Sequence, residues 1–171
     1  MLQQRGLQRL GRIVAGHEAG ADPAQQDQAD APLQHLLVHA HQLQGAPGTG
    51  QLCKLANQIG IASGMIAMSE ALAFAHATGL NLDTTLRSIS GGGASSWALL
   101  NLAPRVLKGD FAPGFYVKHF VKDIGLALDV CREQKISLPG LELAAKLYAD
   151  VVAAGEGDAG TQALAKLYFS R

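Results

Sequence analysis

The residues best suited to chemistry lie where a glycine-rich turn leads into an apolar helix. Lys54 is followed three and four residues later by Asn57 and Gln58. A helical period places these three polar side chains on one face of the helix. Because burying a cation and two amides is costly unless they are paired, the pattern indicates a site for an oxygen-rich small molecule.

The glycine-rich turn also begins like a phosphate-binding loop. Gly45 and Gly50 satisfy the first half of the motif G-x-x-x-x-G-K-[ST]. Gln51 and Leu52 occupy the positions at which this motif needs its phosphate-binding lysine and its magnesium-binding hydroxyl. Lys54 comes three residues too late to replace that lysine, so the nucleotide-hydrolase interpretation is disfavoured.

Histidine and cysteine give little support for a metal site or a disulfide. His35, His39 and His41 have no matching cysteine or acidic cluster beside them, which favours a histidine-rich tail over a zinc site. We therefore predict no metal. Cys53 and Cys131 lie within helical patterns and are expected to be reduced and buried.

Two other polar groups leave alternatives open. Ser96, next to Trp97, follows a glycine-rich turn. Its hydroxyl could bind a carboxylate, or it could cap a helix while Trp97 packs in the core. Lys118 and Lys122 form a like-charged pair at helical spacing, so either both are solvated or an anion lies near them.

Apolar periodicity and turn residues predict helices joined by short turns from residue 49 onward, with almost no strand signal. The expected helices are 49–77, 83–90, one that follows Ser96 and is interrupted near Pro104, 117–134, 139–155 and 158–169. The predicted fold is all-α, a helical bundle around one long central helix, formed by residues 45–171. Residues 1–44 show no sustained period and are expected to be an atypical N-terminal segment, poorly ordered or a truncated remnant of a nucleotide-binding domain.

Composition favours a globular protein without a nucleic-acid or membrane partner. The 171 residues are 48% hydrophobic and 16% charged, with a formal net charge of zero. Glu70 and His76 interrupt the longest apolar run, which leaves a stretch too short to span a bilayer. With no evident secretory signal and two cysteines, we expect a cytoplasmic protein.

Taken in order, the motifs resemble the β-hydroxyacid dehydrogenases, a family that includes 3-hydroxyisobutyrate dehydrogenase and tartronate semialdehyde (2-hydroxy-3-oxopropionate) reductase. The family pattern G-x-G-x-x-x-K-x-x-N-[NQ] is matched in register by Gly48, Gly50, Lys54, Asn57 and Gln58. Further matches extend the resemblance over about residues 45–168, at residues 69–72, 95–97, 104–105, 110–115 and 122–127.

The resemblance implies the C-terminal helical domain, similar to that of 6-phosphogluconate dehydrogenase, of an NAD(P)-dependent oxidoreductase that interconverts a 3-hydroxy acid and its semialdehyde. Lys54 would be the general acid and base that exchanges a proton with the substrate oxygen. Lys122 would contact the cofactor, NAD or NADP. The residues at substrate-binding positions would be Asn57, Gln58, Ser96, Phe115 and Asp123.

The same resemblance implies a homo-oligomer that pairs through the helical domain. No G-x-G-x-x-G fingerprint follows a strand, so we expect little turnover from this chain alone. The alternative interpretation is a non-catalytic helical oligomerisation module. Near the end of the chain, Gly160 and Gln162 replace the usual acid and serine of the family pattern G-x-G-D-x-D-x-S-A-L.

Overall fold

A computed structural model describes residues 44–169 of the chain. The chain divides into two compact units, Met1–Asn57 and Gln58–Arg171, and the boundary falls within helix α3 (Thr49–Ala77). The predicted domain boundary after residue 44 stays a prediction. His35, His39 and His41 lie outside the described residues.

In the first unit, the glycine-rich turn leads directly into α3. Gly45 and Gly48 have positive φ angles of 119° and 95°, which side-chain-bearing residues rarely adopt. The backbone N–H of Thr49 donates to the carbonyl of Ala46 at 3.1 Å, and the Thr49 hydroxyl donates to the same carbonyl at 2.8 Å. These two bonds close the turn from which the helix starts.

The second unit contains the rest of α3 and the remaining helices. These are α4 (Leu82–Ser90), α5 (Trp97–Asn101), α6 (Ala103–Leu107), α7 (Val117–Gln134), α8 (Pro139–Ala153), the 3₁₀ helix η2 (Thr161–Ala165) and α9 (Lys166–Phe169). The all-α prediction is confirmed: over residues 44–169, β pairing is confined to one isolated bridge between Tyr116 and Gly160.

The predicted last helix, 158–169, is wrong in its first part. The backbone of residues 157–160 bonds to the first turn of α7 and to the loop before it. The N–H of Val117 donates to Ala159 at 2.9 Å, and the N–H of Lys118 donates to Gly157 at 3.0 Å. Because these carbonyls are used between segments, helical structure begins only at Thr161.

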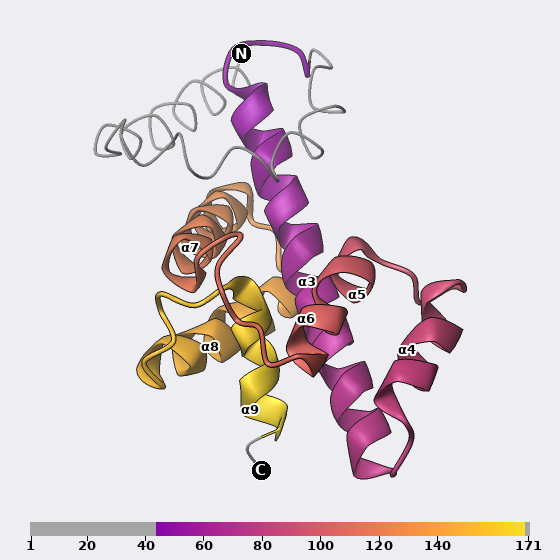
Figure 1. The fold of residues 1–171 in the computed structure, drawn as a ribbon. Helices are drawn as coiled ribbons and strands as arrows, with labels where there is room; N and C mark the ends of the chain where they lie inside the picture. Colours follow the sequence, from indigo (N-terminus) through magenta and orange to yellow (C-terminus); the bar gives the residue numbers. More distant parts are fainter. Residues whose placement is uncertain (1–43, 170–171) are drawn as a thin grey trace. The chain divides into compact units, whose positions relative to one another are not determined.

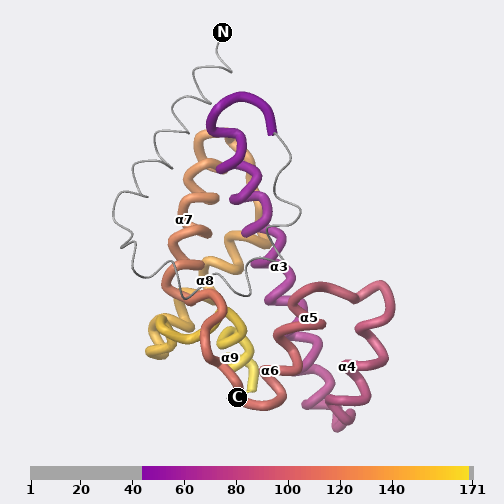
Figure 2. Tube along the Cα trace, turned by 45° about the horizontal axis from the view of Figure 1, so that its top comes forward, coloured from indigo at the N-terminus to yellow at the C-terminus, as the bar shows by residue number. Residues whose placement is uncertain are grey.

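The helices α7 and α8 lie side by side and form much of the core (Figures 1 and 2). Phe120 of α7 meets Tyr148 of α8 edge to face, with ring centroids 4.9 Å apart. The Tyr148 hydroxyl donates to the carbonyl of Thr161 at 2.9 Å, which ties α8 to η2. Burial raises the pKa of Tyr148 far above its usual range, so this hydroxyl stays a donor.

Residues 58–77 of α3 supply a second continuous buried stripe. Its members are Gln58, Ala62, Met65, Ile66, Met68, Ser69, Leu72 and Ala75. Each of these residues lies three or four positions from another of them, which keeps the set along one broad side of the helix, as a core helix requires. The long helix is therefore central to the second unit, as predicted.

By length and composition, α3 could also cross a membrane. The core helix of a soluble protein passes the same test, so this finding is weak evidence for a span. The buried stripe includes the polar side chains of Gln58 and Ser69, and Ser69 donates its hydroxyl to the Met65 carbonyl at 2.8 Å. The absence of a membrane partner stays a prediction.

Candidate functional site

The structure brings Gln58 and Asp123 together inside the second unit. The Gln58 amide nitrogen, Nε2, donates to Oδ2 of Asp123 at 2.5 Å. The two residues are only 7% and 9% exposed. α7 presents Asp123 on its buried side because Phe120 and Ala127, three residues before and four after it, also lie there. Burial of this carboxylate and this amide is tolerated because the two groups are joined by a hydrogen bond.

This pair has the chemistry expected of a polar-ligand site. A carboxylate offers acceptors, and an amide offers both donors and an acceptor, so together they can engage hydroxyl and carbonyl groups. The predicted grouping of Gln58 with Asp123 corresponds to a direct contact between residues 65 positions apart. Whether substrate binds there stays a prediction.

The first lysine of α7 has a partner on another segment of the chain. The ammonium of Lys118 contacts Oδ1 of Asp158 at 2.6 Å and lies 5.2 Å from the centroid of the Tyr116 ring. The hydrogen bond to Asp158 raises the pKa of Lys118. Lys118 is thus a surface charge with a partner on the protein. The closeness of Lys118 and Lys122 in sequence therefore does not require a bound anion between them.

Lys122 lies next to Asp123 in sequence but is exposed. A lysine ammonium at the surface suits a phosphate group, which it binds as a compact positive charge. The residues present therefore fit a contact with a phosphate of NAD or NADP.

Phe115 lies at the end of a loop that is fixed on both sides. Its ring is partly exposed and packs edge to face on Phe120, with centroids 6.0 Å apart. Its carbonyl accepts a hydrogen bond from the Thr161 N–H at 3.1 Å. The structure does not bring Phe115 into a recorded contact with Gln58 or Asp123, and its role in substrate binding stays a prediction.

The loop is anchored by an arginine that the sequence reasoning left without a role. Arg105 binds Asp110 through two nitrogens, at 2.8 and 3.1 Å, and donates to the Ala112 carbonyl at 2.6 Å. The hydrogen bond from Arg105 is the main cause that holds the pKa of Asp110 below its ordinary value. In the sequence, the signal that could have revealed this anchor was an arginine followed five residues later by an aspartate.

Ser96 is a helix cap. Its hydroxyl oxygen accepts a hydrogen bond from the N–H of Leu99 at 3.1 Å, at the start of α5. This confirms the capping alternative, while a contact between its hydroxyl and substrate stays a prediction. The expectation that Trp97 packs in the core is wrong: it is 55% exposed, because α5 turns Ala98 and Leu99 inward instead.

Lys54 and Asn57 belong to the first unit, where both are exposed on the first turns of α3. Their proposed roles stay predictions.

The expectation of a buried thiol is confirmed for Cys131 and wrong for Cys53. Cys53 lies on the exposed side of the same helical turns as Lys54, next to it in sequence.

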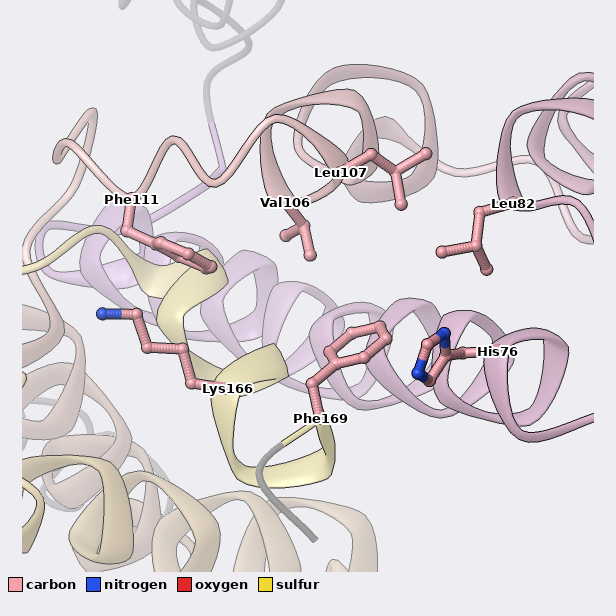
Figure 3. Close-up of a pocket in the computed structure, with 7 residues that line it drawn as sticks. All are labelled: His76, Leu82, Val106, Leu107, Phe111, Lys166 and Phe169. Atoms are coloured by element: carbon pink, nitrogen blue, oxygen red, sulfur yellow. The ribbon is translucent and has the colours of Figure 1, made fainter.

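A separate cavity of about 470 Å³ opens at the far end of α3 (Figure 3). It is lined by His76, Leu82, Val106, Leu107, Phe111, Lys166 and Phe169. His76 follows Gln58 by eighteen residues on the same helix, which corresponds to about 27 Å. None of the predicted site residues lines the cavity.

Within residues 44–169, no group of three metal-ligating side chains is found.

Comparison with known proteins gives consistent matches. The sequence model of a family described as "NAD-binding of NADP-dependent 3-hydroxyisobutyrate dehydrogenase" matches residues 48–168. An uncharacterized oxidoreductase of Bacillus subtilis is 48% identical over 141 residues, which cover 82% of this chain and 49% of the relative. A probable mitochondrial 3-hydroxyisobutyrate dehydrogenase-like protein of Arabidopsis thaliana is 47% identical over 146 residues, or 85% of this chain and 43% of the relative.

A solved structure agrees with these sequence matches. The 3-hydroxyisobutyrate dehydrogenase of Mycobacterium tuberculosis, solved with L-serine, superposes with a TM-score of 0.67 at 31% identity. The superposition covers 72% of this chain and 44% of that one. The chain therefore spans about half the length of the curated relatives it matches.

Proposed function

Because this chain belongs to the 3-hydroxyisobutyrate dehydrogenase family, we propose that it carries the proton-transferring lysine of an NAD(P)-dependent oxidoreductase. The reaction is the interconversion of a 3-hydroxy acid and its semialdehyde. The observation that supports this most is the family match over residues 48–168, within which Gln58 and Asp123 meet in a buried polar contact.

In this proposal Lys54 acts as general acid and base. When bound, NAD(P) supplies the hydride in reduction and accepts it in oxidation. In reduction the Lys54 ammonium gives its proton to the carbonyl oxygen, so the product is a neutral hydroxyl; in oxidation the neutral amine takes that proton back. Lys54 precedes Gln58 by four residues in the sequence.

The other site residues bind and orient. Asp123 fixes the amide of Gln58, so that Gln58 and Asn57 present groups that hydrogen-bond to substrate oxygens. The Ser96 oxygen accepts from Leu99, and its own hydrogen remains able to donate to a carboxylate. The relative solved with L-serine supports this substrate class, because serine is a 3-hydroxy acid.

Phe115 and Lys122 complete the proposal. The partly exposed ring of Phe115 provides apolar contact with the substrate's carbon skeleton. Lys122 contacts a phosphate of the cofactor. Neither NAD nor NADP is favoured by the residues on this chain.

The test is an assay of NAD(P)H oxidation with tartronate or methylmalonate semialdehyde. Because little turnover is expected from this chain alone, it is fused for the assay to the part of the Bacillus subtilis relative that it does not cover. Replacing Lys54 with alanine should lower the rate by about 10²- to 10⁴-fold, as expected for loss of a general acid. Lys54→Arg should be similarly slow, because arginine stays protonated near neutral pH. Cys53→Ala, at the exposed neighbouring position, should leave the rate unchanged. A Lys54→Ala variant as active as the wild type would contradict the proposal.

The second candidate is a helical module that pairs with another copy of itself. Phe74, Trp97 and Leu100 are large apolar side chains of the second unit that remain exposed, and association with another copy is one way to cover them. Light scattering over a range of concentrations tests this. A monomer throughout would contradict the homo-oligomer, and a stable oligomer without dinucleotide binding would favour the non-catalytic module. A cytoplasmic location is also part of the proposal, and cell fractionation would test it.

A further inference from the structure

The two positions at which this chain departs from the family pattern are in direct contact. Gln162 is only 1% exposed, and its side chain folds back over Gly160. A Cβ atom added at Gly160 would lie 2.3 Å from Oε1 of Gln162 and 2.8 Å from its Nε2. Side-chain atoms do not approach that closely, so any residue other than glycine at 160 would have to displace the Gln162 amide.

The Gln162 amide cannot move without breaking hydrogen bonds. Its Nε2 donates to the carbonyl of Asp110 at 3.2 Å and to that of Ala112 at 3.1 Å. Both carbonyls belong to the loop that ends at Phe115. The Gly160 backbone N–H adds a third bond to this loop, to the Phe111 carbonyl at 2.9 Å.

This loop leads into the part of α7 that carries the candidate site. Phe115 is bonded through its carbonyl to the Thr161 N–H, and Tyr116 pairs with Gly160. α7 begins one residue later, at Val117. The position of the Phe115 ring is thus set by the segment that contains Gly160 and Gln162.

We infer that Gly160 and Gln162 form a positioning pair for the candidate site. The Gln162 amide occupies the space that a side chain at position 160 would fill, and from there it holds the loop 110–115 that presents Phe115. The two departures from the family pattern depend on each other, because a residue larger than glycine at position 160 and a glutamine at position 162 would compete for the same space. Only the effect on substrate rests on the proposed function.

A double-mutant cycle tests the pair by thermal unfolding of the full chain. Gly160→Ala should lower the melting temperature by about 8 °C, since it creates a buried clash. In a Gln162→Ala background the same substitution should cost no more than about 2 °C, because the clashing amide is gone. Gly157→Ala is the control, because nothing lies within 4 Å of a Cβ built there. Equal losses in both backgrounds would overturn the inference.

The side-chain amide itself gives a second, spectroscopic test. In the wild type, the two Nε2 protons of Gln162 should exchange slowly with solvent and appear as separate signals in a ¹H–¹⁵N spectrum. Gly160→Ala should shift these signals and speed their exchange, whereas Gly157→Ala should leave them unchanged. Fast exchange in the wild type would contradict the two recorded hydrogen bonds and the inference.

The effect on the site is measured with Gln162→Met, which keeps the length of the side chain and removes its donors. If Phe115 contacts substrate, this variant should raise KM for the semialdehyde by about 3- to 10-fold and change kcat by less than about 2-fold. Unchanged KM would refute the positioning role. These rates are measured with the chain fused to the part of the Bacillus subtilis relative that it does not cover. If that fusion has no turnover, the proposed function fails, while the double-mutant cycle and the Gln162 amide signals still test the contact between Gly160 and Gln162.

Discussion

Replacing Gln58 with leucine tests the buried polar contact on which the candidate site is built. The Gln58 amide donates to a buried carboxylate of Asp123 at 2.5 Å. A hydrogen bond to a charged group contributes about 1.5–3 kcal/mol, and its loss would leave Asp123 buried without this donor. At about 4 °C per kcal/mol for a folded domain of this size, the melting temperature should fall by about 6–12 °C.

The assay is thermal unfolding followed by far-ultraviolet circular dichroism. Asn57→Leu, at the exposed neighbouring position, is the control and should cost less than about 0.5 kcal/mol. In the double variant Gln58→Leu/Asp123→Leu, both polar partners are gone, and much of the lost stability should return. Strictly additive losses in this cycle would show that the two side chains do not interact, and would refute the reasoning.

Two further predictions concern the parts that support the site. Tyr148→Phe should lower stability by about 1–2 kcal/mol in chemical denaturation, because the buried carbonyl of Thr161 loses its donor. An unchanged denaturation midpoint would contradict that hydrogen bond. Asp110 has a pKa below its ordinary value of 3.8, so its stabilisation is present above that pH and is lost as the pH falls through the lowered pKa. The wild type should therefore be more stable than Asp110→Asn at pH 6, with the difference shrinking in acid; a constant difference would be the contrary result.

Local sequence signals predicted the helices well. The apolar stripe of residues 117–134 and the first-turn proline at 139 correspond to α7 and α8 as they are found. Each depends on the helical period or on a fixed backbone angle, and both are local properties of the chain. The resemblance, rather than any spacing, joined Gln58 to Asp123, because nothing local relates residues 65 positions apart.

The errors fall where contacts between distant segments decide the outcome. Residues 157–160 form bonds with the first turn of α7 and the loop before it, and the last helical segment therefore begins only at Thr161. The exposure of Trp97 depends on which side of a short helix meets the core, and five residues carry too little periodicity to decide it. The fit of Gln162 over Gly160 likewise needs coordinates, because it rests on the path of the loop 110–115.

Calorimetric titration of the chain with NAD⁺ and NADP⁺ tests the central claim most directly. The account predicts saturable binding of at least one dinucleotide, weakened about five-fold by Lys122→Met through the loss of about 1 kcal/mol of phosphate contact. Lys118→Met should have no such effect, because the family resemblance assigns the cofactor contact to Lys122 and not to Lys118, whose ammonium contacts Asp158. Absence of binding by the wild type, or equal weakening by both substitutions, would contradict the account.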